Sequence, residues 1–132
     1  MKSKQIMERV IGLGGLFLKT KDPKALAAWY EKHLGVAFNN STYTMWNFAN
    51  EDGTQKEGFN LLSFFKNESD YFAPSEKAVM INFVVKDLFG LLNVLKEEGI
   101  EAVGDPVDGE YGKFGWILDP EDNKVELWQP PA

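Results

Sequence analysis

The chain contains the same pattern twice, and this internal duplication limits its possible folds more than any other feature. Lys21-Asp22 recurs as Lys86-Asp87, an offset of 65 residues (86 minus 21). An apolar stretch precedes each pair, at residues 13–18 and 79–85, and apolar residues at helical spacing follow it. Two tandem units of similar structure are therefore expected.

Each unit has signals for a strand followed by a helix. Asp22 and Asp87 are placed to cap helix N-termini, and Pro23 suits a first helical position because it has no N–H to leave unpaired. Gly35 and Gly99 suit the left-handed conformation that ends helices.

Short segments with alternating polarity follow each helix and predict further strands. They lie at residues 43–48 and 58–65 in the first unit, and at residues 102–103, 112–118 and 124–128 in the second, with turns at Asp108-Gly109 and residues 119–123. We predict one α+β domain over residues 1–132, built from two tandem β-α-β-β-β units. The first unit spans about residues 11–66, the linker 67–77, and the second about 78–130.

Two segments carry a more specific pattern: KDPKALAAWYEKHLGV at residues 21–36 and FGWILDPEDNKVELWQP at residues 114–130. The first resembles the opening strand-to-helix segment, and the second the closing hairpin, of the vicinal oxygen chelate superfamily, which contains glyoxalases, bleomycin-resistance proteins and dioxygenases. The resemblance covers roughly residues 11–130. It implies that the two units form a half-open barrel around a cavity.

The resemblance also implies where metal-dependent members would carry their ligands. Those positions fall on Gly15, Met80 and Glu126, with either Asn60 or Leu61 as the fourth. Glycine has no donor atom, and a thioether or a neutral amide is a poor ligand for the divalent ions of this chemistry. The prediction is therefore no metal site and no cofactor.

The histidine and cysteine content leads to the same expectation. His33 is the only histidine and lies near the end of the first predicted helix, so one chain cannot form a two-histidine, one-carboxylate iron site. The chain has no cysteine, which excludes disulfides and thiolate zinc sites.

The candidate site consists of the predicted inward face of the strands, with Trp46, Tyr111 and Trp116 on adjacent strands expected to close the mouth of the cavity. Glu126 is the candidate catalytic group, and alternation along its strand places Trp128 on the same face. The candidate ligand-binding residues are aromatic, aliphatic or amide side chains: Trp46, Asn60, Met80, Asn82, Tyr111, Trp116 and Trp128. Each has a structural alternative: Glu126 could pair with a lysine at the rim, the asparagines could bond local backbone, and the tryptophans could pack in the core.

Charge and hydropathy limit the partners. The formal charge is −6 with the two signs interspersed, so nucleic acid is not an expected partner. No apolar run reaches the roughly 18 residues that span a bilayer, and the first ten residues lack the apolar stretch of a secretion signal. We expect a cytoplasmic protein that does not interact with membranes, and the resemblance implies a homodimer.

The leading functional hypothesis is a metal-independent protein that binds a small organic molecule, either planar or cationic, in an aromatic pocket. The alternative is a glyoxalase I-like lyase or isomerase that uses Glu126 as metal ligand or general base. A fold resemblance alone does not decide between them.

Overall fold

A computed structural model describes residues 9–131, except for the side chains of residues 49 and 55–58. Residues 1–8, on which part of the expectation against export rests, lie outside the described residues. The elements in chain order are β1 (Val10–Thr20), α1 (Pro23–Leu34), β2 (Tyr43–Ala49), β3 (Gln55–Lys66), β4 (Val79–Val85), α2 (Leu88–Glu97), β5 (Val107–Gly109), β6 (Gly112–Leu118) and β7 (Lys124–Gln129).

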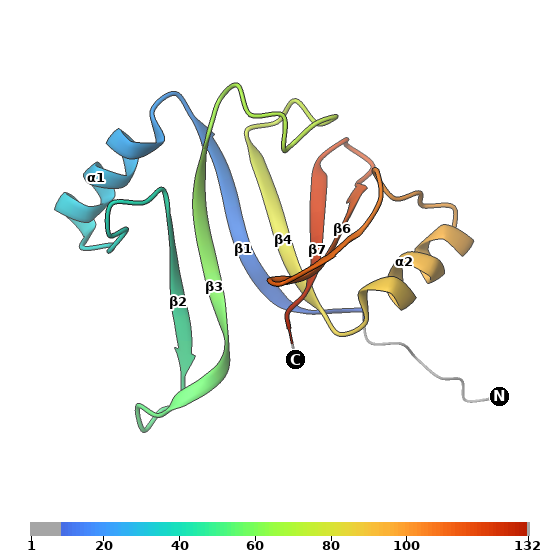
Figure 1. Cartoon of the computed structure of the whole chain (residues 1–132), viewed down its shortest axis with the longest axis horizontal. Coiled ribbons are helices and arrows are strands. Elements are labelled where there is room, and N and C mark those ends of the chain that lie inside the picture. Colours follow the sequence, from blue (N-terminus) through green and yellow to red (C-terminus); the bar gives the residue numbers. More distant parts are fainter. Residues whose placement is uncertain (1–8, 132) are drawn as a thin grey trace.

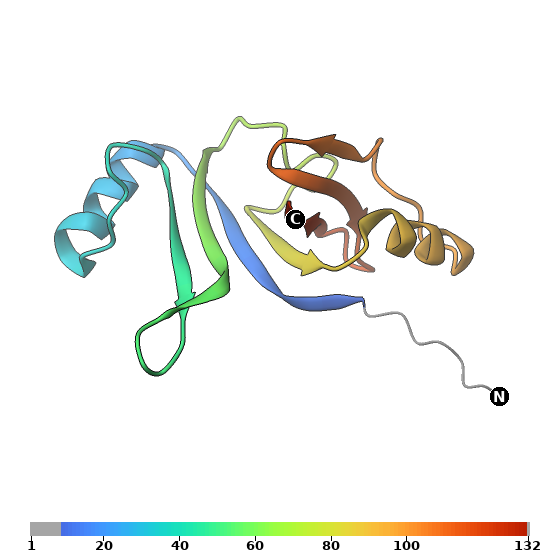
Figure 2. The ribbon, with the colours of Figure 1, turned by 60° about the horizontal axis from the view of Figure 1, so that its bottom comes forward.

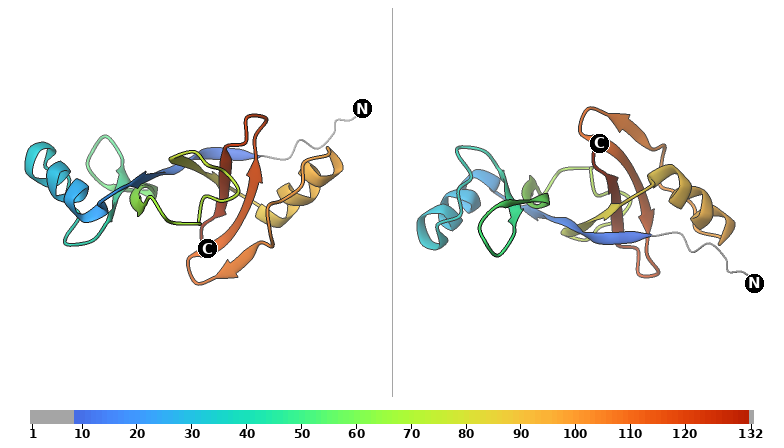
Figure 3. Two further views of the ribbon diagram at one scale, coloured as in Figure 1. Left: turned by 90° about the horizontal axis from the view of Figure 1, so that it is seen from above. Right: turned by 90° about the horizontal axis from the view of Figure 1, so that it is seen from below.

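The strands form one seven-stranded sheet in the order β2-β3-β1-β4-β7-β6-β5. The two helices lie at opposite ends of the molecule (Figure 1). The sheet curls on the side of the second unit and does not close, so β2 and β5 remain its edges (Figures 2 and 3). The predicted α+β class is confirmed, although the first unit has two strands after its helix where the second has three.

The helices begin and end where the sequence predicts. The Asp22 side chain accepts a hydrogen bond from Ala25 N at 3.0 Å, and Asp87 accepts one from Gly90 N at 3.1 Å. Gly35 ends α1 with φ of 69°, which is the left-handed region that glycine enters without steric cost.

The two units meet along β1 and β4, which pair antiparallel at the centre of the sheet. Gly15 lies opposite Asn82, and Phe17 lies opposite Met80. The 65-residue offset of the repeat relates Gly15 to Met80 (80 minus 15) and Phe17 to Asn82 (82 minus 17). Each residue of one pair therefore has its repeat equivalent in the other pair. The sequence duplication is therefore an approximate two-fold symmetry of the structure.

The sheet has two chemically different faces. Helix α2 covers one face of the second unit through a cluster built on Leu88, Leu91 and Leu127, and α1 covers the first unit through Ala27 and Phe64. The other face carries a separate buried cluster centred on Phe17, Phe72 and Met80. We call this face, which lies away from the helices, the inner face.

The structure corrects two details of the second unit. Residues 102–103 are not a strand, although Val103 N donates to Trp116 O at 2.7 Å. Asp108 and Gly109 belong to β5, and the turn falls on Glu110 and Tyr111. The Asp-Gly pair is a common turn signal, but here the register Gly109 to Gly112 moves the turn two residues along.

Candidate functional site

The position of Glu126 is set by the tight turn that joins β6 to β7. Asp119 Oδ1 accepts hydrogen bonds from the backbone of Glu121 and Asn123, both at 2.9 Å, and Asn123 Nδ2 donates to Asp119 Oδ2 at 2.8 Å. This turn fixes the hairpin register, which places Trp116 opposite Glu126. Both side chains consequently lie on the inner face.

Glu126 is a buried carboxylate that accepts hydrogen bonds from three neutral donors. Asn82 Nδ2 donates to Oε1 at 2.6 Å, and Trp116 Nε1 donates to Oε2 at 2.8 Å. The Tyr71 hydroxyl also donates to Oε2. The Glu126 side chain is only 1% exposed, and its donors come from β4, β6 and the segment between the two units.

Lys124 lies on the same face, two residues before Glu126 on β7. Its ammonium donates to the backbone oxygen of Tyr71 at 2.7 Å and lies 5.5 Å from the Tyr71 ring centre and 5.4 Å from that of Trp116. Burial lowers the pKa of Lys124, against the attraction of Glu126 and Asp70. Tyr71 is therefore held by β7 at both its hydroxyl and its main chain.

The Tyr71 hydroxyl stays protonated over the whole neutral range. Burial raises the pKa of Tyr71 above its usual value of 10.0, and the negative charge of Glu126 raises it further. A second negative charge beside the carboxylate would be strongly disfavoured, so Tyr71 acts as a donor there.

Protein side chains occupy the interior around Glu126 in this conformation. Phe72, which is 0% exposed, packs with Phe17 and Met80, and Tyr71 and Trp116 pack against this cluster. The segment between the units, predicted as a linker, thus inserts two aromatic rings at the place where the resemblance implies a cavity.

The structure brings four of the predicted residues into contact or close proximity on the inner face. Asn82 and Trp116 contact Glu126 directly, and Met80 is in the buried cluster beside Trp116. Trp128 is 7% exposed and follows Glu126 on the same face; its Nε1 donates to Tyr111 O at 2.8 Å.

Three predicted residues lie elsewhere. Tyr111 is in the β5–β6 turn with its side chain 73% exposed. Trp46 and Asn60 are paired across β2 and β3, on the face that α1 covers. Asn60 Nδ2 donates to Leu13 O at 2.6 Å, so this amide bonds backbone.

The choice between Asn60 and Leu61 is settled by the register of β3. Leu61 pairs with Gly15 and packs against the inner cluster, whereas Leu62 packs with the α1 cluster. Side chains alternate along a strand, so Asn60 shares the helix-covered face with Leu62. Leu61, which has no donor atom, is the residue on the inner face.

Asn82 carries a polar atom without a partner. Its Oδ1 is buried and accepts no hydrogen bond among the described residues, and a Cβ built on Gly14 would lie 1.9 Å from it. The missing side chain of Gly14 therefore makes room for the Asn82 amide, which places Nδ2 against Glu126. An unpaired buried acceptor costs about 1–3 kcal/mol.

The inner face does not fit the metal site that the resemblance implies for many family members. Gly15 has no donor, and a Cβ built there would lie 2.2 Å from Leu61 O, so the backbone leaves no space for a ligand side chain. Leu61 and Met80 provide no oxygen or nitrogen ligand, and both Glu126 oxygens already accept hydrogen bonds. Within residues 9–131, no group of three His, Cys, Asp or Glu could hold an ion.

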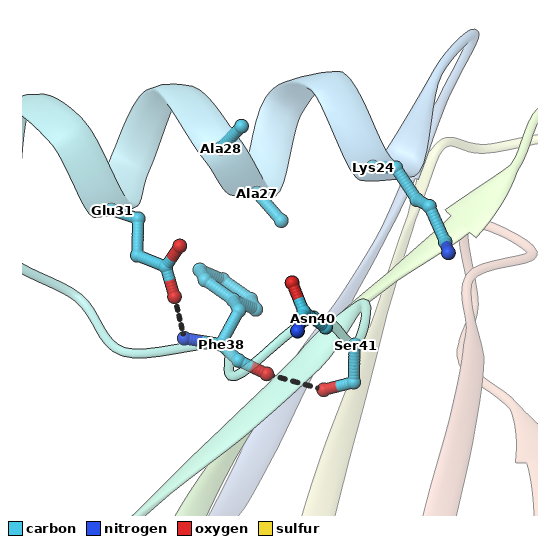
Figure 4. A pocket seen from close by; sticks show the side chains of 7 residues that line it. All are labelled: Lys24, Ala27, Ala28, Glu31, Phe38, Asn40 and Ser41. Atoms are coloured by element: carbon cyan, nitrogen blue, oxygen red, sulfur yellow. Dashed lines mark hydrogen bonds between the residues drawn. The ribbon is translucent and has the colours of Figure 1, made fainter.

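Among the described residues, two of the pockets lie on the first unit, away from Glu126. One has a volume of about 220 Å³ and lies beneath α1, where Glu31 accepts a hydrogen bond from Phe38 N at 2.8 Å (Figure 4). Glu31 also accepts a hydrogen bond from Asn39 N at 3.1 Å. The wall of this pocket is formed by Lys24, Ala27, Ala28, Glu31, Phe38, Asn40 and Ser41. The other, of about 580 Å³, follows the edge strand β2 and includes Tyr43, Met45 and Trp46.

Sequence reasoning missed Tyr71 and Lys124. Lys124 was detectable, since it shares the inner face with Glu126 by strand alternation. Tyr71 gave a weaker signal, an aromatic pair with Phe72 inside a polar linker.

Two related strand–helix–strand units sharing one curled sheet, with a buried carboxylate on the face away from the helices, define a duplicated α+β domain. The chain belongs to the Glyoxalase/Bleomycin resistance protein/Dioxygenase superfamily, whose sequence profile matches residues 12–127. No protein with a curated description has a significantly similar sequence.

Solved structures with this fold include methylmalonyl-CoA epimerases. The enzyme from Mycobacterium tuberculosis is 16% identical with a TM-score of 0.63, covering 98% of this chain and 95% of its own. A single-residue variant of the Streptomyces coelicolor enzyme, in complex with 2-nitronate-propionyl-CoA, is 17% identical with a TM-score of 0.62, covering 96% and 100%. An NAD-dependent benzaldehyde dehydrogenase from Legionella pneumophila is 14% identical with a TM-score of 0.53, covering 89% and 98%. At these identities the likeness shows the fold alone.

Neither helix in the described residues is long and apolar enough to cross a membrane.

Proposed function

We propose that this chain is a metal-independent protein that binds a small organic molecule on its inner face, beside Glu126. The observation that carries the proposal is the Glu126 carboxylate, buried among aromatic rings and bonded only to neutral donors. A few convergent polar groups in an aromatic surrounding are typical of sites for small ligands.

The donor set supports the metal-independent part of this proposal. Of the four positions implied for ligands, Gly15, Leu61 and Met80 contribute no oxygen or nitrogen, and Glu126 is the single carboxylate. One carboxylate does not hold a divalent transition ion with useful affinity.

Access for a ligand requires movement of the segment between the units. Tyr71 and Phe72 fill the inner face beside Glu126, while the strands on either side are fixed by the sheet. In this proposal the ligand enters when these two rings move away.

The four tryptophans provide a direct test because two lie on the inner face and two outside it. Trp116 and Trp128 flank Glu126, whereas Trp29 is 52% exposed on α1 and Trp46 is 48% exposed on the helix-covered face. In chelator-treated ¹⁵N-labelled protein, aromatic fragments are expected to shift the indole signals of Trp116 and Trp128 and to leave those of Trp29 and Trp46 unchanged. Shifts confined to Trp29 and Trp46 would refute an inner-face site.

The metal-independent part has its own experiment. Calorimetric titration of stripped protein with Ni²⁺, Zn²⁺, Mn²⁺ and Fe²⁺ is expected to show no binding tighter than about millimolar, which is only about 4 kcal/mol. Micromolar binding that disappears in Glu126→Ala would overturn it.

A second candidate is an isomerase or glyoxalase-type lyase with Glu126 as the general base. The epimerase structures with this fold favour it, since epimerisation moves a proton at carbon. Such a substrate must reach a carboxylate oxygen that Asn82, Trp116 or Tyr71 now contacts. Solvent deuterium exchange into thioester or methylglyoxal–thiol substrates, absent in Glu126→Gln, would support this candidate.

We also propose that the chain forms a homodimer, as the superfamily resemblance implies. Edge strand β2 exposes Tyr43, Met45, Trp46 and Phe48, each at least 37%, and unpaired apolar edges are usually covered in native proteins. Sedimentation analysis is expected to give a dimer that Trp46→Lys weakens.

A further inference from the structure

The ring of Tyr71 occupies the inner face as a bound ligand would. It stacks on Phe65 with ring centres 5.5 Å apart and planes 3° from parallel, and it meets Trp116 edge-on at 6.2 Å. Phe17 is a third neighbour, with ring centres 6.4 Å apart. Three aromatic side chains from two strands of the first unit and one of the second thus surround one phenol ring.

The polar contacts of this ring are specific at both ends. The Tyr71 hydroxyl donates a hydrogen bond to Glu126, and the main-chain oxygen of Tyr71 accepts one from the Lys124 ammonium at 2.7 Å. Both partners lie on β7 and face the same side. Together they select a molecule with a hydroxyl donor at one end of an aromatic ring and an acceptor at the other.

The segment that carries Tyr71 is attached to the sheet mainly through side chains. The backbone hydrogen bonds shown for residues 69–75 are local, from Ser69 N to Lys66 O, Ala73 N to Asp70 O and Ser75 N to Phe72 O. Displacing the ring therefore breaks no pairing between strands.

Resting on the proposed function, we propose that the ligand is a neutral para-substituted phenol that takes the place of Tyr71. Its hydroxyl donates to Glu126, its ring stacks on Phe65, and an acceptor on its substituent meets Lys124.

The charges beside the Tyr71 position argue against the other aromatic classes. A cationic ring in this position would lie beside the Lys124 ammonium, which is already within 5.5 Å of the ring it would replace. An anionic group at the hydroxyl position would lie against the Glu126 carboxylate. The structure thus narrows the planar or cationic ligand expected from the sequence to a planar, neutral hydrogen-bond donor.

Three probes of similar size separate these classes: p-cresol, toluene, which lacks the hydroxyl, and benzyltrimethylammonium, which is cationic. In the wild-type protein each probe must displace the Tyr71 side chain. Tyr71→Phe retains the ring but loses the hydrogen bond to Glu126, so residue 71 is displaced more easily by every probe. Calorimetry is therefore expected to show p-cresol binding at least tenfold more tightly to Tyr71→Phe than to wild type. On Tyr71→Phe, p-cresol is expected to bind at least tenfold more tightly than toluene, because only p-cresol donates to Glu126. Tyr30→Phe, altered in a tyrosine that packs on Phe64 on the helix-covered face, is the matched control and is expected to behave as wild type.

A longer probe tests the second contact. The compound 3-(4-hydroxyphenyl)propanamide reproduces Tyr71 from its hydroxyl to its carbonyl. It is expected to bind Tyr71→Phe more tightly than p-cresol does, and Lys124→Met is expected to remove that advantage while leaving the p-cresol affinity within threefold.

The outcomes separate this inference from the proposed function. Equal binding of p-cresol and toluene, or a preference for benzyltrimethylammonium with shifts at Trp116, would overturn the phenol assignment and leave the inner-face site standing. Failure of every aromatic probe to bind wild type or Tyr71→Phe would overturn both.

Discussion

Glu126→Ala, which removes the carboxyl group, and Glu126→Gln, which replaces it with a neutral amide, should have very different effects on the free energy of unfolding. Glu126→Ala leaves three donors without their acceptor. Asn82 is 2% exposed, so its unpaired amide costs about 2 kcal/mol, while Trp116 and Tyr71 are partly exposed and cost about 1 kcal/mol each. The three lost hydrogen bonds together cost about 4 kcal/mol and a residual cavity adds to this, while removal of the charge's desolvation offsets part of the loss, as it does in Glu126→Gln.

Glu126→Gln should cost less than about 1 kcal/mol, for a reason specific to this site. The glutamine oxygen can accept from Trp116 and Tyr71, and its NH₂ then faces Asn82. Asn82 can rotate its amide so that Oδ1, which now has no partner, accepts from that NH₂. Each hydrogen bond weakens by about 1 kcal/mol when its acceptor becomes neutral. Against this, the variant no longer has the desolvation cost of a buried charge, which is several kcal/mol.

Urea unfolding followed by tryptophan fluorescence at pH 7 measures both variants, with equal m values as the check on a common unfolded state. Because the relief of desolvation is common to both variants, their difference in unfolding free energy reports the hydrogen bonds, and a difference below about 1 kcal/mol with small losses in both would refute the shared-acceptor geometry. An equally large loss in both variants would show that the charge matters and that the Asn82 amide does not rotate.

Four further predictions each centre on one residue. The pKa of Tyr71 is raised in the folded state, so above pH 10 the free energy of unfolding should fall by at most about 1.4 kcal/mol per pH unit. Urea titrations of Tyr71→Phe at alkaline pH should lack this fall. Gly15→Ala should cost about 1–3 kcal/mol because the added methyl meets the backbone oxygen of Leu61. Gly14→Ala should cost a similar amount, because the added methyl meets the Asn82 side chain. In a double-mutant cycle followed by urea denaturation, Asn82→Ala should recover part of the loss in Gly14→Ala and none of the loss in Gly15→Ala. Asp22→Ala should lower the unfolding free energy by about 1 kcal/mol through loss of the α1 cap, and thermal melts of the variant should show it.

Local chemistry explains why much of the fold could be predicted from the sequence. Asp22, Asp87 and Gly35 act within their own turns, so their roles follow from neighbouring residues alone. The duplicated Lys-Asp pairs then related the two units, and alternation along β7 placed Glu126 and Trp128 on one face.

The parts that could not be predicted depend on register or on distant contacts. Asn60 and Leu61 differ by one position, and only the pairing of β3 with β1 decides which faces inward. Tyr71 lies in a segment with no periodic pattern, and it donates a hydrogen bond to a residue 55 positions away. The residues next to Tyr71 in the sequence therefore do not predict this bond.

The position of Tyr71 between the units also bears on how such a chain could arise and be re-engineered. A duplication supplies two copies of a folded unit, but the junction that joins them has no counterpart within either copy. Here the junction provides a hydrogen bond to Glu126, so the complete site is a property of the fused protein and of neither half. Circular permutation normally cuts such exposed connections without harm. In this protein a cut between residues 67 and 77 would divide the site itself.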